Sequence, residues 1–104
     1  MASLLKLYSG ELHRENRRQY RDGYTAGCSW AQAADRSLLR TKGRWLETAQ
    51  RSFVGGRSVH DALRYVAGAD FEADSADDVL WPDGFAQGII DEYRRLLECL
   101  RTAA

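Results

Sequence analysis

The chain has 104 residues, enough for one domain with its own core, because a folded chain of this size buries roughly 60–70% of the surface that its unfolded form exposes. Its composition, with 44% hydrophobic and 29% charged residues, is typical of a globular domain and excludes a disordered chain. No apolar run approaches the roughly 18 residues needed to span a bilayer, so we expect a cytoplasmic protein with no membrane partner.

The net charge of zero hides two oppositely charged halves. Residues 1–57 carry 11 Lys and Arg against 5 Asp and Glu, whereas residues 58–104 carry 4 against 10, which gives +6 and −6. Between Arg64 and Arg94 there are eight acids and no Lys, Arg or His. This separation predicts charge pairing within one molecule or between two copies of the chain in a homodimer.

The first predicted helix spans residues 11–34, after a break at Ser9-Gly10. Its first half is almost wholly polar, but from Tyr20 onward apolar and small residues recur at helical spacing on two neighbouring rows. Because these rows together cover a wide face, we expect the second half of this helix to be a central element that the other helices surround.

Two shorter helices are predicted next, at residues 38–54 and 58–67. Asp35 to Ser37 offers capping chemistry before the first of them, Thr41 to Gly43 is a candidate interruption, and Gly55-Gly56 ends it. Ser58 is the expected N-cap of the second, which ends at Gly68.

Residues 69–80 are acidic and irregular, and we expect a loop there. Pro82 at a first helical position starts the last predicted helix, residues 82–101. No segment alternates with period two for long enough to indicate a strand. The expected fold class is therefore all-α, a compact bundle of about four helices forming a single domain over residues 1–104.

A repeated pattern links the first and last predicted helices. Asp22-Gly23-Tyr24-Thr25-Ala26-Gly27 and Asp83-Gly84-Phe85-Ala86-Gln87-Gly88 each place an acid before two glycines four residues apart. Glycine costs a helix roughly 1 kcal/mol relative to alanine, so four glycines at this spacing indicate that bare backbone is needed for close helix packing.

The acidic segment from Asp70 to Asp83 is the favoured contact surface for a partner. Since one sign of charge covers it, we expect a non-enzymatic protein–protein interaction module, of the inhibitor or adaptor type, that binds a basic protein. We expect Phe71 and Trp81 to anchor the partner, because buried aromatics carry much of the energy of interfaces; the alternative is that both pack the loop onto the core. The predicted acidic contacts are Asp70, Glu72, Asp74, Asp77, Asp78 and Asp83.

The basic half supports an alternative function, nucleic-acid or ribosome binding. Arginines neutralise phosphates and an aromatic stacks on bases, and the candidate residues are Arg14, Arg17, Arg18, Tyr20 and Arg21. The segment Gly23–Gly27, with Arg44-Trp45-Leu46 downstream, resembles the ribosome modulation factor family, small basic helical proteins that bind ribosomes. The resemblance covers less than a third of the chain, which lacks the Cys-Pro-Tyr element between the two parts of that pattern.

The sequence contains no pattern typical of a catalytic or metal-binding site. His13 and His60 are the only candidates for acid–base chemistry near neutral pH, and neither has a recognisable catalytic context, so we expect no enzyme, no cofactor and no metal site. The acids at positions 70, 72 and 74 have the spacing of a calcium loop but lack its glycine and its final glutamate. Cys28 and Cys99 are interpreted as small buried apolar residues in a reducing compartment.

Overall fold

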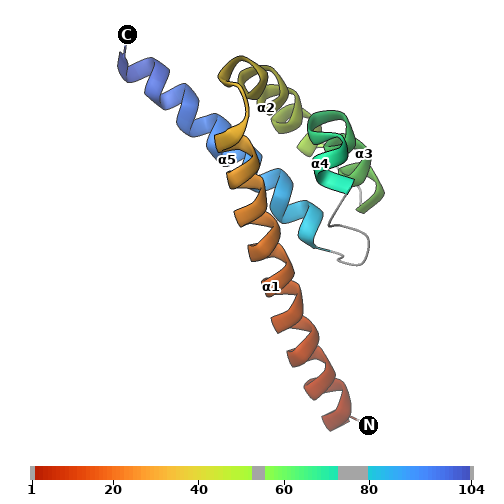
Figure 1. Cartoon of the computed structure of the whole chain (residues 1–104). Coiled ribbons are helices and arrows are strands. Elements are labelled where there is room, and N and C mark those ends of the chain that lie inside the picture. Colours follow the sequence, from red (N-terminus) through yellow and green to blue (C-terminus); the bar gives the residue numbers. More distant parts are fainter. Residues whose placement is uncertain (1, 53–55, 73–79, 104) are drawn as a thin grey trace.

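The computed structural model describes the backbone of residues 2–52, 56–72 and 80–103, and the side chains of residues 14–52, 59–71 and 80–102. These segments contain helices and turns and no strand, which confirms the all-α class. The helices are α1 (Ala2–Ala33), α2 (Arg36–Gln50), α3 (Gly56–Ala67), α4 (Ala69–Glu72) and α5 (Trp81–Ala103) (Figure 1). None of the helices in this part of the chain is long and apolar enough to cross a membrane.

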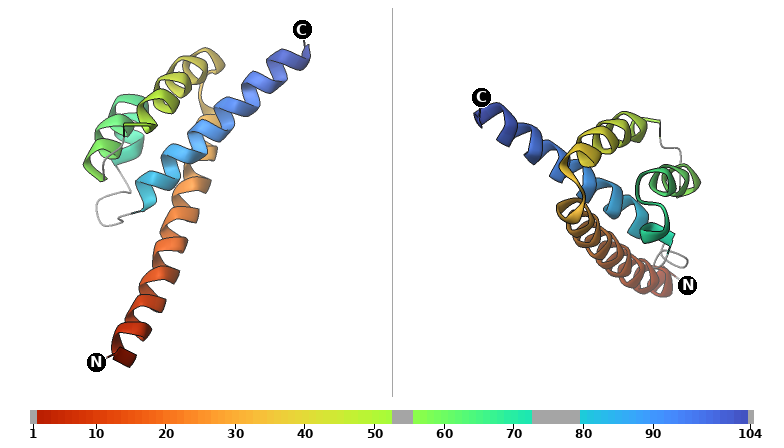
Figure 2. Two further views of the ribbon diagram at one scale, coloured as in Figure 1. Left: turned by 180° about the vertical axis from the view of Figure 1, so that it is seen from behind. Right: turned by 45° about the horizontal axis from the view of Figure 1, so that its top comes forward.

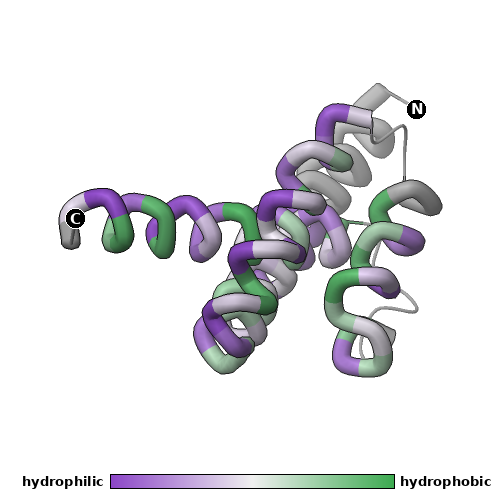
Figure 3. Tube along the Cα trace, turned by 90° about the horizontal axis from the view of Figure 1, so that it is seen from above, coloured by the Kyte–Doolittle hydropathy of each residue, from purple (hydrophilic) through white to green (hydrophobic). Residues whose placement is uncertain are grey.

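α5 is the central helix of the bundle. α1 crosses it on one side, α2 and α3 pack on another, and α4 packs on α3 (Figure 1). The first part of α1 and the last part of α5 extend beyond the other helices toward opposite ends of the molecule (Figure 2), whose extents are 60 × 27 × 24 Å. Hydrophobic residues continue to recur along the projecting part of α5 (Figure 3), where Leu100 is exposed.

The hydrophobic core forms around α5 because its apolar stripe faces α2, α3 and α4 at once. α5 supplies six of the buried hydrophobic residues, whereas α1 supplies Ala31 alone. The core consists of Ala31, Leu39, Leu46, Val59, Ala62, Leu63, Val66, Phe71, Trp81, Phe85, Ala86, Ile89, Ile90 and Tyr93.

The expectation that α1 is a central, surrounded element was wrong. Its face away from α5 is exposed at Arg21, Thr25 and Ser29. The small residues on its other face match an apolar pattern, but they serve one close crossing with α5 rather than burial on all sides.

The structure differs from the prediction at two glycines and at one helix cap. α1 already begins at Ala2, so Gly10 does not break it, and α2 continues through Gly43. α2 begins at Arg36 because the carboxylate of Asp35 accepts a 2.8 Å hydrogen bond from the backbone N–H of Ser37.

The predicted acidic loop at 69–80 is partly wrong, since Ala69–Glu72 forms the short helix α4. Gly68 separates it from α3 with a φ of 58°, a left-handed conformation that glycine adopts without strain. Residues 73–79 lie outside the described residues, as does the predicted stop of the second helix at Gly55.

Candidate interaction surface

The glycine crossing, formed by Gly23, Gly27, Gly84 and Gly88, is the contact that joins α1 to α5. A Cβ atom added to any of these glycines would lie far closer than 3.0 Å to a backbone carbonyl oxygen of the facing helix. The two backbones therefore touch without side chains between them, in a contact of the Cα–H···O kind. The expectation that the glycines mark close packing is confirmed.

The two copies of the repeated pattern face each other in an approximately two-fold relationship. Gly27 meets the carbonyl of Phe85, and Gly88 meets the carbonyl of Tyr24. In both cases the carbonyl belongs to the residue three positions before the partner glycine. Gly23 and Gly84 follow the same rule, because Gly23 meets the carbonyl of Trp81 and Gly84 meets the carbonyl of Tyr20. The repeat is thus a structural device for crossing two helices.

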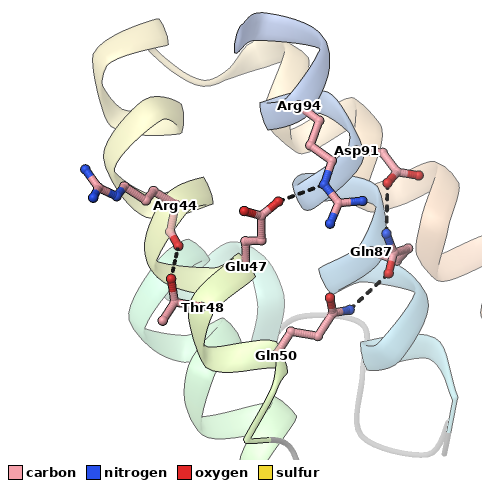
Figure 4. Close-up of polar contacts among 7 residues, drawn as sticks. All are labelled: Arg44, Glu47, Thr48, Gln50, Gln87, Asp91 and Arg94. Carbon is pink, nitrogen blue, oxygen red and sulfur yellow. Dashed lines mark hydrogen bonds and ion pairs between the residues drawn. The ribbon is translucent and has the colours of Figure 1, made fainter. Parts of the chain in front are cut away.

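A chain of polar side chains runs beside the crossing and links α1, α5 and α2. The hydroxyl of Tyr24 donates a 2.7 Å hydrogen bond to Oδ2 of Asp91, and Nε2 of Gln87 donates to Oδ1 of the same carboxylate at 2.8 Å. Nε2 of Gln50 donates to Gln87 at 3.0 Å (Figure 4). The hydrogen bond to Asp91 raises the pKa of Tyr24, because the carboxylate stabilises the neutral phenol.

An ion pair adds a second link between α2 and α5. Nε of Arg94 lies 2.7 Å from Oε2 of Glu47 (Figure 4), and this hydrogen bond raises the pKa of Arg94. Both side chains are partly exposed, so the pair contributes little to stability. The polar groups of this region are engaged in holding helices together, and no group of three metal-ligating side chains occurs among the described residues.

The two described acids of the predicted acidic surface lie in different environments. Asp70 is exposed on α4, where its carboxylate accepts a 3.1 Å hydrogen bond from the indole N–H of Trp30. Asp83 is half-buried on α5, next to a hollow lined by Tyr20 and Gln50. Burial raises the pKa of Asp83, and the nearby His60 opposes this shift. The side chains of Glu72, Asp74, Asp77 and Asp78 lie outside the described residues.

Phe71 and Trp81 do not reach the surface. Phe71 is 0% exposed and Trp81 is 7% exposed, so both belong to the core, and neither is accessible to a partner in this structure. Their ring centroids are 6.1 Å apart, and each ring also packs on Phe85. Residues 71 and 81 therefore lie side by side in the core.

The arginines among the described side chains of α1 are all at the surface. The guanidinium of Arg18 pairs with Glu15 at 2.6 Å, and this hydrogen bond lowers the pKa of Glu15. Tyr20 is partly exposed and lines a shallow hollow with Arg17 and Leu80. The exposed arginines of this segment are Arg14, Arg17, Arg18 and Arg21.

A surface that the sequence analysis did not identify lies on α2 and α3. This α2–α3 patch consists of Leu38, Trp45 and Tyr65, which are 41%, 40% and 56% exposed. The Trp45 and Tyr65 rings pack with centroids 4.5 Å apart, and Nζ of Lys42 lies 3.5 Å from the Tyr65 ring centroid. A signal existed in the sequence, because Leu38 and Trp45 are seven residues apart and therefore share a helix face.

Cys28 and Cys99 are both free. Cys28 is half-buried beside the glycine crossing, where burial raises the pKa of its thiol. The expectation that both cysteines are buried was wrong for Cys99, which is exposed on α5, where it lines a hollow with Arg36 and Leu39 of α2.

Comparison of the chain with protein-family models, with curated proteins and with solved structures gives no significant match.

Proposed function

We propose that this chain is a small non-enzymatic protein that binds a basic protein through its acidic segment, residues 70–83. The packing of Phe71 on Trp81 supports this proposal most directly. Because Phe71 and Trp81 pack on each other in the core, the two described ends of the acidic segment lie close together on the molecule. A local concentration of one charge steers an oppositely charged partner toward that place.

The described neighbourhood of the segment adds to this support. Asp70, at its start, is held by Trp30 and is still exposed, so its charge faces solvent. Asp83, at its end, is half-buried. Residues 72–79 between them carry Glu72, Asp74, Asp77 and Asp78 and no basic residue.

Charge reversal tests the proposal. Proteins captured from the native cell extract are first identified, and association rates of the purified partner are then measured at low and high salt. We expect Asp74→Lys/Asp77→Lys/Asp78→Lys to slow association strongly at low salt, with a difference that shrinks as salt rises, because exposed charges are screened beyond about 8–10 Å.

The matched control reverses three acids on other parts of the surface, Glu15, Asp22 and Glu98. It changes the net charge by the same amount, so a specific acidic contact leaves this control close to the unaltered protein. Equal slowing by both triple variants would show that only net charge matters and would remove the acidic segment as the contact surface.

A second candidate function is nucleic-acid binding through α1. The observation that favours it is the exposure of Arg14, Arg17, Arg18 and Arg21 on the part of α1 near its projecting end, with Tyr20 accessible among them. Exposed arginines beside an aromatic ring fit the phosphates and bases of a single strand.

Gel-shift titrations with single-stranded RNA and duplex DNA over a range of salt concentrations test this candidate. We expect the triple variant Arg14→Gln/Arg17→Gln/Arg21→Gln to reduce the slope of log K against log salt by about 2 on single strands, at about 0.7 for each phosphate that is no longer neutralised. Binding with an unchanged slope would exclude α1 as the contact surface.

A further inference from the structure

A hollow between α2 and α5 is lined by two arginines and by no acid. Its volume is about 380 Å³, within the range of small-molecule sites, and its lining residues are Arg40, Thr41, Arg44, Tyr93 and Leu97. Arg40 and Arg44 lie four residues apart on α2, so they are neighbours on the surface of that helix. Like charges at this spacing repel each other, and an anion bound between them relieves the repulsion.

Two acids lie near this hollow in the sequence, and neither lines it. Glu47, the single acid of α2, pairs with Arg94 of α5, and the Arg44 side chain points away from this pair (Figure 4). Glu98 of α5 is exposed outside the hollow. Within the part of the chain that the structure describes, neither Arg40 nor Arg44 makes an ion pair. Both are exposed, so each can turn its guanidinium group over the hollow.

Tyr93 brings an unused hydroxyl group to the same hollow. The residue is only 5% exposed, yet its hydroxyl makes no hydrogen bond to any residue that the structure describes. In the described residues every fully buried polar side-chain atom has a hydrogen-bond partner, so this hydroxyl reaches the surface. The hollow is the open space that Tyr93 lines, and it therefore offers an O–H donor there beside the two arginines.

Gly43 shows that the place of Tyr93 is built into α2. This glycine is buried within the helix, and a Cβ atom added to it would lie 2.6 Å from Cβ and Cγ of Tyr93. Glycine weakens a helix interior relative to alanine, and here it lets the Tyr93 side chain lie directly on the α2 backbone. The phenol is thus held in position before any ligand binds, which reduces the entropy lost on binding.

The donors around the hollow match a phosphate monoester. At neutral pH this group has nearly two negative charges and three terminal oxygens, which suit two guanidinium groups and one hydroxyl. A carboxylate has one charge and two oxygens, so it leaves one donor unused. Leu97 and the Tyr93 ring add apolar surface beside the donors, and this surface favours an organic phosphate over inorganic phosphate.

We propose that this hollow binds a small organic phosphate monoester. Arg40, Arg44 and the Tyr93 hydroxyl donate to the phosphate oxygens, and Leu97 contacts the organic part. The site is formed by α2 and α5, whereas the two candidate functions use the acidic segment and the arginines of α1. It can therefore be tested without either of their partners.

An NMR titration of the isotope-labelled chain with phenyl phosphate, in a buffer without phosphate, tests the site. We expect chemical-shift changes centred on residues 40–44 and 93–97, and weaker binding of inorganic phosphate and of benzoate. Arg40→Gln/Arg44→Gln should raise the dissociation constant for phenyl phosphate by at least about tenfold, because charge-assisted hydrogen bonds are lost. The matched control Arg17→Gln/Arg21→Gln removes an exposed arginine pair of the same spacing from α1 and should leave the affinity close to that of the unaltered protein.

Tyr93→Phe tests the hydroxyl by itself, because the ring stays on Gly43. We expect the dissociation constant for phenyl phosphate to rise about tenfold, the usual effect of losing a hydrogen bond to a charged group. Tyr65→Phe, which removes an exposed hydroxyl from α3, is the control and should have no effect. Circular dichroism verifies that each variant is folded.

Four results would overturn the proposal. The first is a spectrum that does not change at millimolar phenyl phosphate, and the second is equal weakening by the α2 variant and by its α1 control. The third is binding of benzoate or inorganic phosphate as tight as that of phenyl phosphate, and the fourth is unchanged affinity in Tyr93→Phe. None of these results bears on the acidic segment, whose partner is a protein.

Discussion

Tyr24 of α1 and Asp91 of α5 are joined by a 2.7 Å hydrogen bond between residues 67 positions apart in the sequence. This bond links the two helices beside the glycine crossing, where backbone lies directly on backbone. The carboxylate of Asp91 also accepts from Gln87, so both of its oxygens are used.

Replacing Tyr24 by phenylalanine should lower the free energy of unfolding by about 1 kcal/mol at neutral pH, because one hydrogen bond to a partly buried carboxylate is removed. The raised pKa of Tyr24 in the folded state means that this contribution is fully present below the ordinary tyrosine pKa of about 10 and is lost as the pH rises above it. Urea titrations at neutral and alkaline pH measure the difference. Tyr20→Phe, with no such bond, is the control; an equal loss in both variants would contradict this role.

Adding one methyl group at the glycine crossing should destabilise the fold. Gly27→Ala gains roughly 1 kcal/mol of helix propensity, but its Cβ meets the backbone of Phe85, and overpacking typically costs ~1–3 kcal/mol. We expect a net loss in thermal unfolding measurements, and a larger loss for Gly27→Leu. The control Ser29→Ala lies on the exposed face of the same helix and should be neutral or slightly stabilising. A higher melting temperature for Gly27→Ala would show that the helices can separate without cost.

Phe71→Ala should cost about 3–5 kcal/mol, the usual result of removing a fully buried phenylalanine. Denaturant unfolding measures this loss, with the exposed Leu100→Ala as the control that changes stability little. A stability change below about 1 kcal/mol would place Phe71 near the surface and return it to the role of a partner anchor.

Asp35→Ala should unwind the first turn of α2, because it removes the carboxylate that accepts a hydrogen bond from the backbone N–H of Ser37. The expected cost is about 1 kcal/mol, typical for removal of an N-cap. Amide hydrogen exchange at residues 36–39 should become faster, while exchange in α5 stays unchanged. Asp22→Ala, an exposed aspartate within α1, is the control.

The positions of α2, α3 and α5 follow from local signals in the sequence, because periodicity and caps act within a few residues. Asp35 and Pro82 mark helix starts that the structure places within two residues of the predicted ones. The glycines at positions 23, 27, 84 and 88 also predict close packing, since nothing else explains their cost in a helix.

The exposure of individual aromatic residues could not be predicted in the same way. Trp81 adjoins an acidic segment and a proline, as surface residues often do, yet it is buried because Phe71 and Phe85 pack on it. Trp45 lies beside the predicted apolar stripe of its helix, and it stays exposed because the Tyr65 ring that packs on it is itself at the surface. Both outcomes depend on contacts between distant segments.

The dependence of α1 on α5 constrains the order in which the chain can fold. Equivalent glycines of the crossing are 61 residues apart, and α1 packs almost entirely on α5. During synthesis α1 is therefore made first and acquires its packing surface last, after α2, α3 and α4 have left the ribosome. Because the loop between the two helices can close only after α5 is made, α1 has no packing partner until then. α1 is therefore the helix most exposed to proteases and to wrong partners while the chain is still being made.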